Sequence, residues 1–171
     1  MKNKTVFILG GLKSGKSTYA VNLAKKAGGT VTYIATAAIT DREIMQRVQN
    51  HVKSRPAGWK TVEEQINLPL AINKVVTKTV IIDCINFWVS NNLYNKHSEE
   101  SILEQAERFC AVLKKKKMNC FIISNEVGLC LVPPNKIGRV FQSVLGKVNQ
   151  IMAKNADEVV FIAAGIAVKI K

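Results

Sequence analysis

The chain has 171 residues, 47% of them hydrophobic, so it can bury one sizeable core and is expected to form a single domain over residues 1–171. It has no run of eighteen apolar residues, which excludes a membrane-spanning helix, and its basic start, Met1–Lys4, leads into a predicted strand and not into a signal peptide. The net charge of +13 fits two classes of protein, a nucleic-acid binder and an enzyme that acts on phosphorylated substrates.

The distribution of the basic residues favours the enzyme. Most are lysines scattered along the chain, and the one cluster, Lys114–Lys117, is expected to be solvated at the end of a helix, where it complements the helix dipole. Aromatic residues make up 6% of the chain and do not alternate with the basic ones, so no platform for stacking bases is predicted. No nucleic-acid partner is therefore expected.

The strongest signal is a glycine-rich stretch between a predicted strand, Lys4–Leu9, and a predicted helix, Ser17–Lys26, that Gly28 and Gly29 close. It reads Gly10-Gly11-Leu12-Lys13-Ser14-Gly15-Lys16-Ser17, the pattern of a phosphate-binding P-loop. Glycines let backbone N–H groups approach an anion, and the helix start adds aligned dipoles. Lys16 supplies a charge for the outer phosphates and Ser17 a hydroxyl for a magnesium ion. The stretch predicts a site for Mg²⁺ with GTP or ATP.

The second predicted strand, Thr30–Ala35, ends in a loop of small residues, Thr36–Ala38, which leaves room for a ligand at the carboxyl end of the strand. A helix is predicted from Asp41 to Arg55, where Pro56 ends it. It carries His51 in a basic stripe with Arg47 and Arg55. Taken alone, a histidine in such a helix is more often packed or exposed than catalytic.

Asp83 is the second candidate ligand for magnesium. It ends a predicted buried strand, Lys78–Asp83, that comes after a short extended segment, Thr61–Glu63, and a helix that opens at Leu68–Ile72. An aspartate in this place holds the magnesium ion of many P-loop enzymes, opposite the P-loop hydroxyl. It also commonly begins a turn, but the P-loop upstream favours the metal-binding interpretation.

The second half of the chain continues the alternation of helices and strands. Helices are predicted at Cys84–Tyr94, Ser98–Lys117 and Ile137–Asn155, and strands at Asn119–Ser124, Glu158–Ala163 and Ile166–Lys171. His97 lies in a polar break and is expected to face solvent. After the strand that ends at Ser124, Asn125 and Glu126 could orient a nucleophile at the nucleotide edge or could cap a turn.

These elements predict an α/β fold with a mostly parallel sheet flanked by helices, and a short final strand after the turn Ala164-Gly165. The four cysteines show no C-x-x-C spacing and are expected to be free, half-buried thiols of a cytoplasmic protein: Cys84, Cys110, Cys120 and Cys130.

Several stretches together resemble one family, the bifunctional adenosylcobinamide kinases/adenosylcobinamide-phosphate guanylyltransferases of cobalamin synthesis. They cover the chain in order, and the most specific are the helix segment Arg47–His51, the turn Arg55–Trp59 and the strand end Asn125–Gly128. Other matching stretches are Gly10–Ser17, Tyr33–Thr36, Val132-Pro133, Gly146–Gln150, Ala156–Val159 and Gly165–Lys171.

The resemblance implies two reactions. A nucleoside triphosphate phosphorylates the aminopropanol hydroxyl of adenosylcobinamide, and GTP then transfers GMP to that phosphate, giving adenosylcobinamide-GDP and pyrophosphate. In the family, GMP is carried on a histidine that aligns with His51, which makes His51 the expected nucleophile. The partners implied are GTP or ATP and adenosylcobinamide or its phosphate. A RecA-like P-loop core and a homotrimer are implied as well.

The resemblance also extends the predicted nucleotide site beyond Lys16 and the rest of the P-loop. It adds Ala35, Thr36, Ala37, Val52, Lys53, Ser54, Arg55, Glu63 and Asp83. Three positions depart from the family: Asp83 stands where glutamate is common, Asn50 stands where some relatives have a second histidine, and Gly58 replaces a bulkier residue common in the turn. The alternatives are a simple small-molecule kinase that leaves His51 idle, and a P-loop ATPase that binds nucleic acid.

Overall fold

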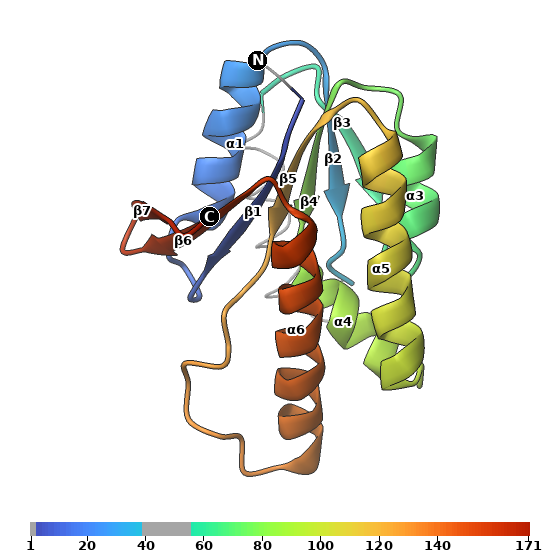
Figure 1. Cartoon of the computed structure of the whole chain (residues 1–171), viewed down its shortest axis with the longest axis vertical. Helices are drawn as coiled ribbons and strands as arrows, with labels where there is room; N and C mark the ends of the chain where they lie inside the picture. Colours follow the sequence, from blue (N-terminus) through green and yellow to red (C-terminus); the bar gives the residue numbers. More distant parts are fainter. Residues whose placement is uncertain (1–2, 39–55) are drawn as a thin grey trace.

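The structure, a computed structural model, describes residues 3–38 and 56–171. Within these ranges, seven strands form one sheet in the order β3-β2-β4-β5-β1-β6-β7 (Figure 1). All neighbouring strands run parallel except β6 and β7, which form an antiparallel hairpin. Their bounds are Thr5–Gly10 for β1, Val31–Ala35 for β2, Lys60–Glu63 for β3, Thr79–Asp83 for β4, Asn119–Ile123 for β5, Glu158–Ala163 for β6 and Ile166–Lys169 for β7.

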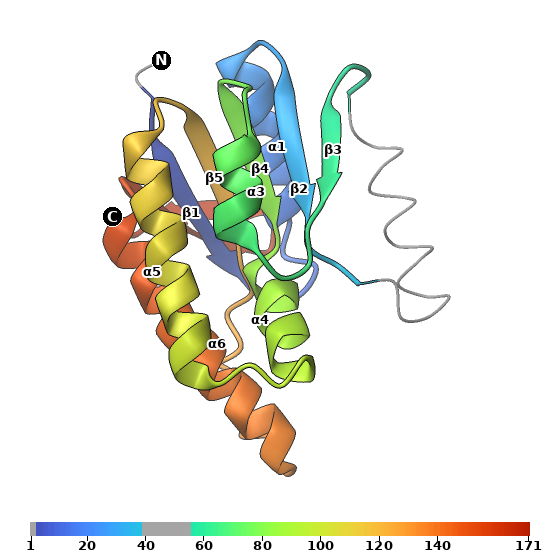
Figure 2. The same cartoon turned by 90° about the vertical axis from the view of Figure 1, so that its right-hand side faces the viewer.

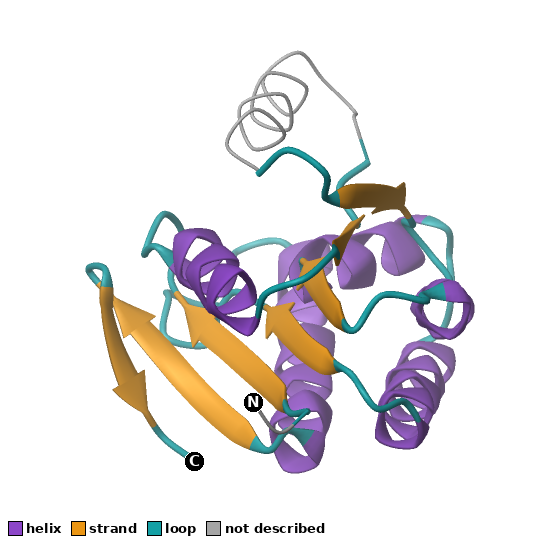
Figure 3. Cartoon of the chain, turned by 90° about the horizontal axis from the view of Figure 1, so that it is seen from above, coloured by secondary structure: helices purple, strands orange, loops and turns teal. Residues whose placement is uncertain are grey.

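Helices cover both faces of the sheet (Figures 2 and 3). Helix α1 packs against one face, and the other helices pack on the opposite face and against one another. The bounds are Lys16–Ala27 for α1, Leu68–Lys74 for α3, Ile85–Tyr94 for α4, Glu99–Lys115 for α5 and Lys136–Asn155 for α6. The predicted fold class and the predicted strands and helices within the described ranges are confirmed. The helix predicted at Asp41–Arg55 lies outside the described residues.

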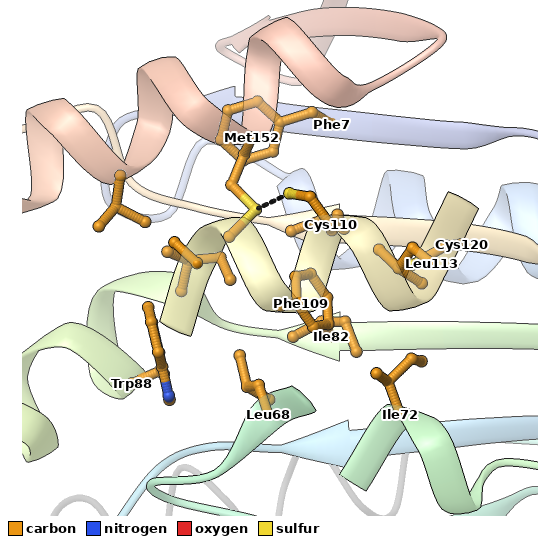
Figure 4. Close-up of a cluster of buried hydrophobic side chains, with 14 of the residues drawn as sticks. Phe7, Leu68, Ile72, Ile82, Trp88, Phe109, Cys110, Leu113, Cys120 and Met152 are labelled. Carbon is orange, nitrogen blue, oxygen red and sulfur yellow. Dashed lines mark hydrogen bonds between the residues drawn. The ribbon is translucent and has the colours of Figure 1, made fainter. Parts of the chain in front are cut away.

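The central strands are buried on both faces, as parallel strands between helical layers must be. In β4, Val80 and Ile82 point into the larger core with α3 to α6, and Ile81 points into the smaller core with α1. Figure 4 shows the larger core, where Phe109 of α5 lies among side chains from the sheet and the neighbouring helices. This packing fixes the strands whose carboxyl ends carry the candidate site.

Two polar side chains are less exposed than the sequence suggested. Lys116 is half-buried, and its Nζ donates to the carbonyl oxygens of Asn73 and Val75 at 2.7 and 2.8 Å, so it satisfies the end of α3 instead of being solvated. His97 is also half-buried, with Nδ1 2.8 Å from Oδ1 of Asn92, because the chain turns back after α4. The expectation that His97 faces solvent was therefore wrong.

The cysteines are free, as expected, but they are not half-buried: Cys84, Cys110 and Cys120 are buried, and Cys130 is exposed. Burial raises the pKa of all three buried thiols, that of Cys110 to about 12. Cys130 is thus the one exposed thiol in the chain, and it lies in the loop before α6.

The buried face of α5 should carry much of the folding stability. Replacing Phe109, which is fully buried, by alanine is expected to lower the free energy of unfolding by about 3–5 kcal/mol, because it removes a large apolar side chain and leaves a cavity. The matched control is Tyr94→Ala, since Tyr94 is 87% exposed and its loss should change stability by less than about 0.5 kcal/mol. Urea denaturation followed by circular dichroism measures both; equal effects would contradict the assigned core.

Candidate nucleotide site

The P-loop connects the end of β1 to the start of α1, and two of its glycines are needed for its path. A Cβ on Gly10 would lie 2.4 Å from the carbonyl oxygen of Ile162 in β6, and Gly10 has a φ of +150°. Gly15 caps α1 with a left-handed φ of +101°, which side chains rarely adopt. The loop therefore passes close to β6 and turns its backbone into the start of the helix.

Lys16 begins α1 and folds back over the loop. Its side chain is 7% exposed, and its Nζ donates to the carbonyl oxygen of Gly11 at 2.6 Å. Because that carbonyl belongs to the loop itself, the ammonium group is held against the P-loop. A point charge held there is suited to the outer phosphates of a nucleotide.

Ser17 and Asp83 come together, as the sequence predicts. The Ser17 hydroxyl donates to Oδ2 of Asp83 at 3.0 Å, although β4 and β1 are separated in the sheet by β5. The Tyr33 hydroxyl donates to the same carboxylate oxygen. No role in the site was predicted for Tyr33. A tyrosine in a buried strand needs a partner for its hydroxyl, and this requirement was the signal that could have placed Tyr33 at the site.

The carboxyl ends of three neighbouring strands lie in register beside this pair. Ala35 of β2 pairs with Asp83 of β4 on one side and with Glu63 of β3 on the other. Ala37 follows, half-buried, while Glu63 is exposed at the edge strand. The register thus brings three of the predicted nucleotide-binding positions to one edge of the sheet.

Thr36 is fully buried and bonds the backbone of Cys84, the residue after Asp83. Its Oγ1 lies 2.6 Å from the carbonyl oxygen of Cys84, to which it donates, and accepts the Cys84 N–H at 2.7 Å. Its own N–H donates to the carbonyl oxygen of Asp83. These bonds fix the backbone that carries the Asp83 carboxylate, so the visible role of the Thr36 side chain is support. Contact between Thr36 and a nucleotide stays a prediction.

The segment after β5 reaches the P-loop through its backbone. The Glu126 N–H donates to the carbonyl oxygen of Gly10 at 3.1 Å, and the Glu126 carboxylate accepts the N–H of Gly128 at 2.6 Å. Asn149 of α6 bonds Ser124 and the carbonyl oxygen of Asn125. The sequence left two roles open for Asn125 and Glu126, orienting a nucleophile or capping a turn. The bond that Glu126 accepts from Gly128 is a turn cap.

The β6–β7 hairpin closes the other side of the loop. The N–H of Gly165 donates to the carbonyl oxygen of Ser14 at 2.9 Å. Leu12 and Lys13 are exposed at the tip of the loop. Five predicted site residues lie outside the described part of the chain: His51, Val52, Lys53, Ser54 and Arg55. Their roles stay predictions.

Neither a membrane-spanning helix nor a cluster of three or more His, Cys, Asp or Glu side chains that could hold a metal occurs in residues 3–38 and 56–171. The metal-binding candidates in these ranges are the Ser17 hydroxyl and the Asp83 carboxylate, and water and nucleotide phosphates commonly supply the other ligands of a protein-bound Mg²⁺.

Comparison with known proteins decides the family. The family model described as cobinamide kinase / cobinamide phosphate guanyltransferase matches residues 6–170. The chain belongs to this family. It is 32% identical to the bifunctional adenosylcobalamin biosynthesis protein CobU of Salmonella typhimurium, over 97% of this chain and 99% of that protein. It is also 32% identical to the corresponding protein CobP of Pseudomonas aeruginosa, over 96% of this chain and 95% of that protein.

Membership in the cobinamide kinase/guanyltransferase family confirms the enzyme class predicted from the sequence, a kinase and guanylyltransferase of cobalamin biosynthesis. Solved structures confirm the RecA-like P-loop fold. A KaiC-like protein from Pyrococcus horikoshii matches with a TM-score of 0.55 and 14% identity, over 94% of this chain and 71% of that one. The RadB recombinase matches with a TM-score of 0.54 and 14% identity, over 94% of this chain and 74% of that one. These two likenesses concern the fold alone.

The close contact at Gly10 can be tested directly. Gly10→Ala is expected to weaken Mg²⁺–GTP binding by about tenfold or more, because its Cβ meets backbone of β6 and must displace the P-loop. Gly146→Ala on α6 is the control, since its Cβ meets nothing within 4 Å. Titration calorimetry measures both affinities. An unchanged affinity for Gly10→Ala would show that the loop is not held against β6 as described.

Proposed function

We propose that the chain catalyses two successive transfers to one corrinoid: phosphorylation of the aminopropanol hydroxyl of adenosylcobinamide, then transfer of GMP from GTP to the new phosphate. The observation that carries this proposal is a P-loop with Lys16, Ser17 and Asp83 assembled at one sheet edge, in a chain that matches the family over residues 6–170. The products of the second step are adenosylcobinamide-GDP and pyrophosphate.

In the kinase step, the hydroxyl oxygen of the corrinoid attacks the γ-phosphorus of a nucleoside triphosphate. The new O–P bond forms as the bond from the γ-phosphorus to the bridging oxygen breaks, the hydroxyl proton passes to solvent water, and the nucleoside diphosphate leaves. Lys16 is placed to bind the outer phosphates through its ammonium group, and the backbone N–H groups of the P-loop bind the remaining negative charge.

In the guanylyl step, we propose His51 as the nucleophile. A neutral imidazole nitrogen attacks the α-phosphorus of GTP, an N–P bond forms, and the bond to the bridging oxygen between the α- and β-phosphates breaks to release pyrophosphate. A phosphate oxygen of adenosylcobinamide phosphate then attacks the same phosphorus and frees His51. Arg47 or Arg55 would spread charge on the transferring group, and nearby positive charge favours the neutral histidine.

The oxygen donors fit a magnesium ion. The Ser17 hydroxyl and the Asp83 carboxylate lie 3.0 Å apart, and hydroxyl and carboxylate oxygens are ligands that Mg²⁺ prefers. When bound, the ion would neutralise charge on the phosphate oxygens. Ser17 and Asp83 would hold it, and Tyr33 and Thr36 would keep the carboxylate oriented. The trimeric assembly and the cytoplasmic location expected from the sequence stay proposals.

The carrier role of His51 can be tested by intact-mass spectrometry after incubation with magnesium and GTP. Wild-type protein should gain the mass of one GMP group, labile in acid and stable in alkali, and His51→Asn should not. His97→Asn replaces the chain's other histidine and should still be labelled. An α,β-methylene analogue of GTP should label none of the three proteins, because it lacks the bridging oxygen between the α- and β-phosphates whose bond to the α-phosphorus must break.

A wild type that binds GTP but is never labelled would leave the simple kinase as the better assignment. Labelling of His51→Asn would show that another residue carries the nucleotide. Labelling confined to proteins that retain His51 is the expected result.

A further inference from the structure

The connection between β5 and α6 is the most apolar exposed part of the described chain. Of the thirteen exposed large hydrophobic side chains in that part, five lie between residues 129 and 140: Leu129, Leu131, Val132, Ile137 and Val140. We call residues 127–140 the apolar arm. Residues 127–135 contain no charged side chain, although 22% of the whole chain is charged. A ligand that covers this surface would remove several large apolar side chains from water, which favours binding.

The arm begins at the nucleotide site. Strand β5 lies between β1 and β4, so its carboxyl end points to the same edge as the P-loop and Asp83. The Glu126 N–H, one residue before the arm, bonds the carbonyl oxygen of Gly10. In Figure 1, the connection continues beyond this edge of the sheet before α6 returns toward the core.

The arm is held in place by hydrogen bonds along its length. Gln142 donates to the carbonyl oxygen of Val127 at 2.6 Å. Arg139 donates to the carbonyl oxygens of Pro133 and Pro134, and the Asn135 side chain caps α6 by accepting the N–H of Gly138 at 2.7 Å. The two ends of the arm are therefore held in place, which lowers the conformational entropy lost when a ligand binds.

We infer that the apolar arm is the docking surface for the corrin ring of the acceptor. This inference rests on the proposed function. The acceptor hydroxyl must reach the γ-phosphate, so its ring must bind at the carboxyl edge of the sheet. A corrin ring is a wide apolar macrocycle edged with neutral amide groups, and an apolar surface whose segment 127–135 carries no charge suits it. The other candidate occupant is a second copy of the chain, which the experiment must separate.

Cys130 lies within the arm and provides a reporter that does not depend on turnover. It is exposed, whereas the other cysteines are buried with raised pKa values, so iodoacetamide near pH 8 should alkylate Cys130 selectively. Saturating adenosylcobinamide, added in the dark, is expected to slow this alkylation by about tenfold or more, while GTP alone should not. Cys130→Ser removes the site and checks the selectivity.

Kinetics give the second readout. The double variant Leu131→Gln/Ile137→Gln changes side chains that are 94% and 82% exposed, so its fold should be preserved. Its KM for adenosylcobinamide is expected to rise about tenfold or more, while its affinity for GTP stays within about twofold. Val76→Gln, 85% exposed in the turn before β4 at the opposite edge of the sheet, is the matched control and should leave both unchanged.

The outcomes separate the possible failures. If the wild type phosphorylates adenosylcobinamide but Cys130 stays unprotected and the KM of the double variant is unchanged, the docking surface is wrong and the proposed function stands. If the wild type shows neither turnover nor protection, the proposed function fails and the inference with it. Two results would show that a second copy of the chain covers the arm, and either would overturn the inference. One is that Cys130 reacts only after denaturation, and the other is that the double variant has a lower molar mass by analytical ultracentrifugation than the wild type.

Discussion

The Asp83 carboxylate is the group on which the geometry of the site depends. It accepts hydrogen bonds from Ser17 of α1 and from Tyr33 of β2, and its own backbone is fixed by Thr36. Ser17 lies on α1 and Tyr33 on β2, so this one acceptor is bonded to side chains from two different elements of the site. In the proposed site, loss of this carboxylate would leave the P-loop in place but would remove one of the two proposed oxygen ligands for magnesium.

The strand order determines which segment of the chain lies beside the candidate nucleotide site. Because β5 is inserted between β1 and β4, the segment after it emerges between the P-loop and Asp83 and is anchored there by the Glu126–Gly10 bond. If the corrin ring docks on the apolar arm as proposed, the acceptor and the nucleotide are held by adjacent strands of one sheet. Such a sheet positions reacting groups more precisely than independent loops would.

The sequence predicted the parts of the site that depend on local pattern. The P-loop and the strand ending in Asp83 are local signals, and both lie where expected. The bonds of Tyr33, of Thr36 with Cys84, and of Gly165 with the P-loop could not be predicted, because each depends on strand order and register between distant segments. The prediction that Lys116 is solvated was wrong for the same reason, because its hydrogen-bond partners are carbonyl groups at the end of another helix. His51 remains a prediction from family resemblance.

We propose that Ser17 and Asp83 hold one magnesium ion together. A double-mutant cycle is the direct test, with Mg²⁺-dependent GTP affinity measured for Ser17→Ala, Asp83→Asn and the double variant. Joint coordination predicts that each single change removes most of the dependence on magnesium and that the double variant binds no more weakly than the weaker single variant. Fully additive losses would mean that the two residues act independently, and this result would contradict the shared metal site.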